Sequence, residues 1–244
     1  MINILIVAFY LVVGIALQKV KAIPHNTAGW LNKYLIYIVL PIIALLYIPP
    51  IDLSPSLLLP ALAAWICFMA SWLFMHLMGN LLNWSKTTTG CLIITGGLAN
   101  TSFLGFPIIE ALYGVEGLQI ALIVDQPGSF LIVSSVAIVV AAIYGEDKVR
   151  KRDISKKILL FPPFLFFLIS VLMNMMNLQV GGYLKEFFLL IALTLTPVAL
   201  IAVGMQIKIR SNSLNGSPLW VGLGYSLVLA PALIYLILGM LLNF

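Results

Sequence analysis

The sequence predicts an all-α, polytopic membrane protein with eight transmembrane helices. Of its 244 residues, 62% are hydrophobic and only 9% are charged, whereas a soluble domain carries about 25% charged residues. Apolar segments close to the roughly 20 residues that a helix needs to cross a bilayer recur along the whole sequence. The short alternating strands that are typical of a membrane barrel are not found in it.

The eight helices follow one another with short polar connections. We expect them at residues 3–18, 30–48, 57–82, 88–113, 117–144, 158–177, 184–207 and 219–243. The first segment has no basic start and no small-residue cleavage site, so it is interpreted as a membrane helix and not as a signal peptide. The second and seventh segments each carry a mid-span proline, Pro41 and Pro197.

The basic residues predict the orientation. All of the 13 Lys and Arg residues except Lys185 lie in the short loops that follow odd-numbered helices or, for Lys33, in the first turn of the next helix. Because Lys and Arg concentrate in cytoplasmic loops, both chain termini are predicted outside, or periplasmic, in a multi-pass plasma (inner) membrane protein. The net charge of +5 is explained by these loops and does not indicate nucleic acid. The basic stretch 146–157 is expected to be a cytoplasmic linker, either solvated or in contact with anionic lipid head groups.

Two segments resemble each other. Residues 29–48 begin Gly-Trp-Leu and residues 182–203 begin Gly-Tyr-Leu, and each has its proline in mid-span. A repeat unit with five helices enters the membrane from opposite sides in its two copies, as in several transporters. The prediction is therefore an inverted repeat, with a first five-helix repeat at 1–145 and an incomplete second repeat of three helices at 158–244.

The fourth helix contains residues that make a poor helix. Gly96, Gly97, Gly105 and Pro107 surround the polar run Asn100, Thr101 and Ser102, and glycine and proline cost about 1 and 3 kcal/mol in a helix interior. Broken backbone persists in lipid only where protein buries it or where it lines a wet cavity. We expect a break near the bilayer midplane, with a second half-helix starting near Phe103 whose positive end favours an anion.

The polar run is the candidate substrate-binding site of this break. Asn100, Thr101 and Ser102 would present amide and hydroxyl groups to a solute. The alternative is a glycine-rich packing face with a proline kink, in which Asn100 only joins helices.

Asp125 is the carboxylate that the sequence places deep in a span. A charge there is costly and marks a functional site by default, so Asp125 is the candidate site for ion or proton coupling. The alternative is a neutral acid bonded to nearby backbone. Glu110 and Glu116 are expected to be solvated at the outer end of the fourth helix, and His76 is expected at the cytoplasmic interface.

Neither enzymatic nor metal-binding signatures are present in the sequence. It contains no HExxH, GxSxG or P-loop motif, and its two cysteines lack metal-ligand spacing. The prediction is therefore no enzyme, no metal and no cofactor.

The stretch LANTSFLGFPIIEALYGVEGLQIALIVDQ, residues 98–126, resembles the fourth and fifth helices of the auxin efflux carrier (AEC) family. The segments IVLPIIALLY and FPPFLFFLISVL are similar to its second and sixth helices. The resemblance implies a secondary transporter (permease) that moves a small organic anion, such as a dicarboxylate or an auxin-like weak acid, by alternating access. It places Asn100 on the family's crossover asparagine, Pro107 on the proline that follows, and Asp125 on an acidic position.

Members of that family usually have ten helices, and eight are predicted here. The expectations are a truncated product, a homodimer that completes the site, or a non-transporting membrane protein that needs a partner. From Asp125 we expect H⁺ as the coupling ion, with Na⁺ the weaker alternative.

Overall fold

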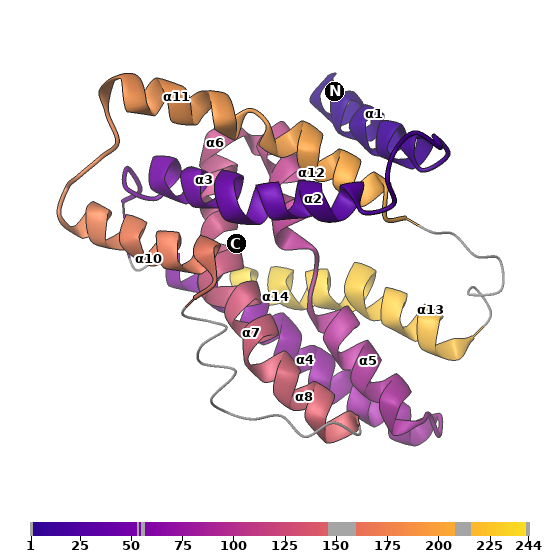
Figure 1. Ribbon diagram of the computed structural model, residues 1–244. Helices are drawn as coiled ribbons and strands as arrows, with labels where there is room; N and C mark the ends of the chain where they lie inside the picture. The colour runs from indigo at the N-terminus through magenta and orange to yellow at the C-terminus, as the bar shows by residue number, and fades with distance from the viewer. Residues whose placement is uncertain (1, 53, 55–56, 146–159, 208–215, 243–244) are drawn as a thin grey trace. The chain divides into compact units, whose positions relative to one another are not determined.

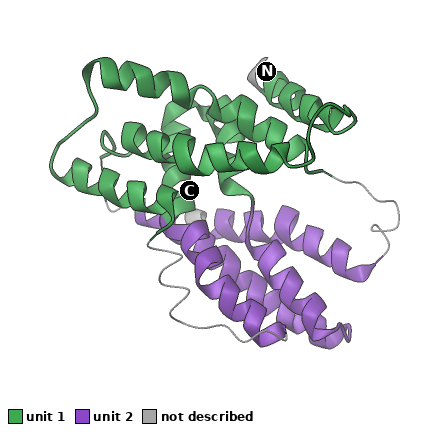
Figure 2. Ribbon diagram, viewed as in Figure 1, with its two compact units in different colours: residues 1–57, 100–126, 159–208 green, residues 58–99, 127–158, 209–244 purple. Residues whose placement is uncertain are grey.

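The computed structural model describes residues 2–52, 54, 57–145, 160–207 and 216–242, and all of its regular structure in these ranges is helical. The chain forms two compact units (Figure 2). Unit 1 comprises residues 1–57, 100–126 and 159–208, and unit 2 comprises residues 58–99, 127–158 and 209–244. The predicted basic linker, 146–157, lies outside the described residues.

Unit 1 contains α-helices, which Figure 1 labels, and short η segments. In chain order they are α1 (Ile2–Leu17), α2 (Thr27–Tyr34), η1 (Leu35–Val39), α3 (Leu40–Tyr47), η3 (Thr101–Gly105), α6 (Phe106–Val124), α10 (Pro162–Met175), α11 (Gly182–Ala192) and α12 (Leu195–Gly204). Asp125 and Gln126, the first two residues of η4 (Asp125–Phe130), also belong to this unit. The η segments are π-helical turns.

Unit 2 contains the remaining helices. They are α4 (Leu58–Leu81), α5 (Lys86–Gly97), the rest of η4, α7 (Leu131–Ser134), α8 (Val136–Tyr144), α13 (Ser217–Gly224), η6 (Tyr225–Leu229) and α14 (Ala230–Leu242). Helix α5 lies beside both α4 and α8. The buried core of this unit includes Phe68, Met75, Ile93, Ile132 and Val140.

Five helical stretches in the described ranges are long and apolar enough to cross a membrane. They are Thr27–Tyr47, Leu58–Leu81, Lys86–Tyr144, Gly182–Gly204 and Ser217–Ile237, and Ile4–Leu17 and Pro162–Met175 are shorter apolar helices. The stretch Lys86–Tyr144 covers the predicted fourth and fifth helices together. An all-helical protein with several membrane-length helices is thus confirmed, whereas the count of eight and the inverted repeat stay predictions.

Prolines explain where the helices widen. Pro41, Pro107 and Pro231 each lie two residues after a π-helical segment, and Pro127 lies inside one. Proline has no N–H to donate, and its ring clashes with the carbonyl four residues earlier. A π turn moves that carbonyl away from the proline ring, so the helix can continue without a break in an apolar environment.

Gly114 makes the turn inside α6. Its backbone has φ 67° and ψ −158°, so α6 has two arms, one before and one after this residue. Residues with a Cβ rarely adopt such a conformation. The turn falls in the predicted connection between the fourth and fifth helices, residues 114–116.

Helices α1 and α12 of unit 1 cross closely. A Cβ atom added to Gly204 would lie 2.9 Å from the Cα of Gly14 and would overlap the carbonyl oxygen of Leu11. The Gln18 side chain closes the same contact, because its Nε2 donates to the carbonyl oxygens of Gly204 at 2.7 Å and Ile207 at 2.9 Å. This crossing fixes the C-terminal end of α12.

Candidate functional site

The helical backbone stops after Gly97 and resumes at Thr101. Leu98, which follows α5, is extended, with φ −120° and ψ 123°. Asn100 has φ −80° and ψ 75°, and its Oδ1 accepts a hydrogen bond from the backbone N–H of Phe103 at 3.1 Å. The carbonyl of Asn100 accepts from Gly105 N–H at 3.0 Å, which closes the first π turn. The helix therefore resumes two residues earlier than the expected start near Phe103.

Asn100 is the N-cap of the resumed helix. Asn is among the best residues in this position, because its side-chain oxygen satisfies an N–H that has no partner inside the helix. The Asn100 side chain is exposed, and it lines a cavity of about 170 Å³ together with Val203, Gln206 and Ile207. The amide group that remains after capping is thus accessible to a solute from a cavity inside unit 1.

Thr101 and Ser102 bond to Asp125. The Thr101 Oγ1 and the Ser102 Oγ both donate to Asp125 Oδ1, the latter at 2.8 Å. Gln126 Nε2 donates to Asp125 Oδ2 at 2.7 Å. Asp125 is 3% exposed and Gln126 is 2% exposed. Three donors therefore surround one buried carboxyl group, which joins the start of η3 to the end of α6.

The predicted site residues thus separate into two groups inside unit 1. Asn100 faces the small cavity, while Thr101 and Ser102 are joined to the predicted coupling residue, Asp125. The sequence predicts one set of three polar residues. It does not predict that the Thr101 and Ser102 hydroxyls donate to Asp125. It also missed Gln126 as a partner of Asp125, although the two residues are adjacent in the sequence.

The predicted helix-breaking residues have different surroundings. A Cβ on Gly97 would lie 2.9 Å from atoms of both Phe68 and Ser71 on α4, which indicates close packing of α5 on α4 in unit 2. A Cβ on Gly96 would lie 3.1 Å from Met75 Cε of the same helix. Gly105 ends η3, and Pro107 is in the first turn of α6. A role for these four residues in the break stays a prediction.

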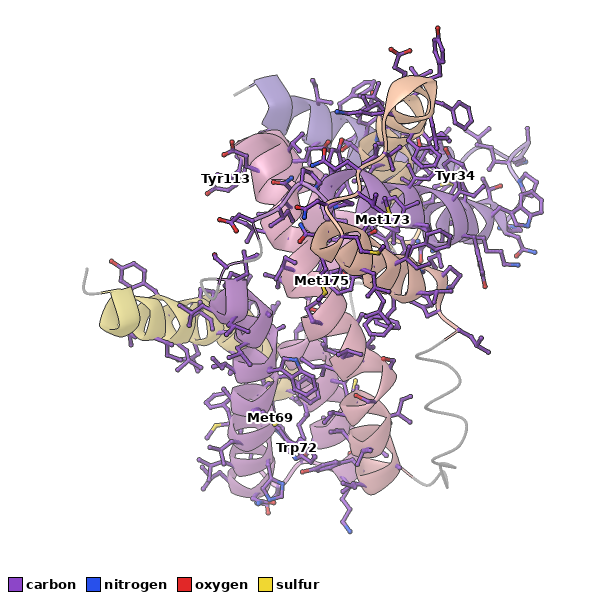
Figure 3. All side chains as sticks on the ribbon, turned by 90° about the vertical axis from the view of Figure 1, so that its left-hand side faces the viewer. Tyr34, Met69, Trp72, Tyr113, Met173 and Met175 are labelled. Carbon is purple, nitrogen blue, oxygen red and sulfur yellow. The ribbon has the colours of Figure 1, made fainter. Side chains whose placement is uncertain are left out.

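A larger cavity lies between the two arms of α6. It has a volume of about 550 Å³ and lies in unit 1. Its lining is mainly apolar, with polar groups on Thr101, Tyr113 and Glu116; the full lining is Thr101, Gly105, Ile109, Tyr113, Glu116, Gly117, Ile120, Ala121 and Val124. Tyr113 is labelled in Figure 3, near the end of the first arm. Thr101 is therefore shared between this cavity and the Asp125 cluster.

Glu110 differs from its expected role. The sequence predicts a solvated side chain, whereas Glu110 is half-buried and its Oε2 accepts a hydrogen bond from Thr196 Oγ1 on α12 at 2.9 Å. The prediction was wrong because the position of a residue along a helix gives its depth in the bilayer, but not which other helix packs against it. Glu110 is thus a second carboxylate inside unit 1 with a specific partner.

His76 lies in unit 2 and is exposed. Its Nδ1 is 2.8 Å from the hydroxyl of Tyr144, and both residues line a cavity of about 310 Å³ with Met69, Trp72 and Leu73. Figure 3 labels Met69 and Trp72 on α4. Within the described ranges, no three His, Cys, Asp or Glu side chains are grouped as a metal site requires.

Comparison with known proteins gives one family match. A family model described as "Membrane transport protein" matches residues 1–243. The chain is 25% identical over 216 residues to an uncharacterized transporter of Methanothermobacter thermautotrophicus, an alignment that covers 85% of this chain and 68% of the relative. It is 27% identical over 227 residues to an uncharacterized transporter of Methanocaldococcus jannaschii, which covers 89% of this chain and 71% of the relative.

Proposed function

We propose that this chain, which belongs to the Membrane transport protein (AEC) family, is a secondary active transporter of a small organic anion. The family description names transport and no catalytic activity, in line with the expectation that the chain is not an enzyme. The solute class, a dicarboxylate or an auxin-like weak acid, follows from the resemblance of residues 98–126. The chain would work by alternating access in a lipid bilayer.

The interrupted helix is the observation that supports this proposal. Backbone amides at the start of a helix have no partner inside the helix, and together with the helix dipole they attract an anion. Here the resumed helix begins at Thr101, and the exposed amide of Asn100 lies beside it. Asn100 would bind the anion through its Nδ2, while its Oδ1 holds the helix start. The depth of this point in the bilayer stays a prediction.

Asn100 variants test the proposal, because the structure separates capping from binding. Ser and Asp at this position keep an oxygen that can cap Phe103, whereas Ala removes both the cap and the amide. A lost hydrogen bond to a charged group costs about 1.5–3 kcal/mol, so Asn100→Asp, which keeps a capping oxygen but has no N–H to donate, should lower the anion affinity about 10- to 150-fold, and further through repulsion. Asn100→Ser keeps one O–H donor on a shorter side chain and should lose less affinity.

The measurement is uptake of labelled succinate and indole-3-acetate by proteoliposomes that contain the full chain. Thermal unfolding of the same preparations reports on folding. Asn26→Ser is the matched control, because Asn26 is also an exposed N-cap residue, that of α2, but its side chain makes no capping hydrogen bond. Wild-type uptake by the Ser and Asp variants would remove Asn100 from the mechanism. If the wild type shows no uptake that exceeds empty vesicles, the rival function, a non-transporting membrane protein, is favoured.

Coupling and location complete the proposal. Asp125 would bind H⁺ during transport, with Na⁺ the weaker alternative, and the chain would reside in the plasma membrane with both termini outside. A homodimer is the proposed assembly if one chain does not complete the site. Uptake in the presence of a proton ionophore, compared with uptake under a sodium gradient, distinguishes the two ions.

A further inference from the structure

We infer that the Thr101 hydroxyl becomes a donor to an anion in the cavity of about 550 Å³ only when Asp125 binds a proton, so that each anion enters this cavity together with one proton. This inference rests on the proposed function and specifies its coupling. It adds a second position for the anion, because Asn100 lines the smaller cavity and Thr101 lines the larger one. The four side chains involved, those of Thr101, Ser102, Asp125 and Gln126, all belong to unit 1.

The hydroxyls are occupied in the structure. A hydroxyl group has a single hydrogen to donate, and those of Thr101 and Ser102 both point to Asp125 Oδ1. A carboxylate solute offers acceptors only, so it finds no free donor on these two side chains. It also meets the negative charge of Asp125 one hydroxyl away. When Asp125 is ionised, an anion therefore finds no hydrogen-bond donor on these hydroxyls and is repelled by the negative charge of Asp125.

A proton on Asp125 reverses both effects. The protonated Oδ1 of Asp125 donates its hydrogen to the Thr101 hydroxyl, which now accepts a hydrogen bond where it donated one before. The hydrogen of Thr101 is then free to turn into the cavity of about 550 Å³ that Thr101 lines. The proton comes from bulk water and returns to bulk water after transport. The O–H bond of Asp125 is the only covalent bond that forms and breaks.

Gln126 can serve both states of Asp125. Its Nε2 donates to Asp125 Oδ2 at 2.7 Å, as suits an ionised carboxylate. Its buried Oε1 has no hydrogen-bond partner among the residues that the structure describes. The Nε2 bond persists when the proton resides on Oδ1, because the protonated carboxyl group still offers Oδ2 as an acceptor. Gln126 therefore favours a proton on Oδ1, the oxygen that the Thr101 and Ser102 hydroxyls contact.

Other acids nearby must be controlled. Within the part of the chain that the structure describes, no charged side chain is bonded to Asp125. Glu116 lines the same cavity as Thr101, and Glu110, on the same helix, is bonded to Thr196. A carboxyl group on either residue absorbs in the same spectral region as that of Asp125. The test is therefore done in the background Glu110→Gln with Glu116→Gln, as well as in the wild-type chain.

Infrared difference spectroscopy of the full chain in lipid nanodiscs tests proton binding directly, without a solute. Acidification should produce a carboxylic C=O band that is absent in Asp125→Asn. Thr101→Val, which removes a hydroxyl at this carboxyl group, should shift the band, and Ser102→Ala should shift it independently. Thr95→Val and Ser134→Ala are matched controls, because those hydroxyls bond to backbone carbonyls four residues earlier in the chain, and they should leave the band in place.

Spectra of the wild type and Asp125→Asn that coincide over the whole pH range would overturn the inference. So would a band that Thr101→Val and Ser102→Ala both leave unmoved. Proteoliposome uptake then separates the two proposals. The apparent Kd for succinate should rise up to tenfold per pH unit in the wild type and stay constant in Asp125→Asn. Equal pH profiles with measurable uptake would refute the coupling alone, whereas no uptake at any pH would refute the transport function.

Discussion

Gly204→Ala should destabilise the protein by about 2–4 kcal/mol because it separates two helices that touch through their backbones. The added Cβ would lie 2.9 Å from Gly14 Cα and 3.0 Å from Ile15 N, whereas such atoms pack well at about 3.5–4.0 Å. Helices α1 and α12 must therefore part by roughly 0.5–1 Å, which forfeits a quarter to a half of each contact energy. Overpacking of this kind typically costs about 1–3 kcal/mol.

Gln18 adds to this loss. It donates to the Gly204 and Ile207 carbonyls at the same crossing, and hydrogen bonds between membrane helices average about 0.6 kcal/mol each. Separation of the helices stretches both bonds, which contributes about 1 kcal/mol. Because Gly14 and Gly204 share one contact, their Ala substitutions should not be additive.

The assay is equilibrium unfolding in detergent micelles, followed by circular dichroism. Gly224→Ala is the matched control: Gly224 has helical φ −59° and ψ −41°, and among the described residues its added Cβ meets no atom within 4 Å beyond its chain neighbours and its own helix backbone. This control should be neutral or stabilising by up to about 1 kcal/mol. Equal changes in the free energy of unfolding for the two variants would show that the close crossing does not exist in the protein.

Three further outcomes are expected. Gly114→Ala should cost about 1–3 kcal/mol in unfolding free energy, because φ 67° with ψ −158° strains any residue with a Cβ; an unchanged midpoint would contradict this turn. Asn174→Leu should cost a similar amount, since Asn174 Nδ2 lies 2.8 and 2.6 Å from the Pro49 and Ile51 carbonyl oxygens, and stability equal to wild type would argue against these bonds. In a cysteine-free chain in intact cells, Glu116→Cys should react with an impermeant maleimide added outside and Lys86→Cys should not; the reverse pattern would invert the predicted orientation.

Sequence composition determined the class of the protein. Apolar segments in lipid must satisfy their backbone internally, so a run of about 20 apolar residues leads to a helix wherever its neighbours lie. The interruption around Asn100 was foreseeable for the same local reason, since glycine, proline and a capping residue occur together there. Residues 98–126 also carried the family resemblance that the match over residues 1–243 confirms.

Only the tertiary structure decided which polar groups meet. Asp125 and Thr101 are 24 residues apart, and their contact depends on how the backbone folds back at Gly114. Glu110 and Thr196 are 86 residues apart, so no local pattern could pair them. Local propensity sets where a helix begins and ends, but the partner of a buried side chain is set by packing between segments, which periodicity along the chain does not encode.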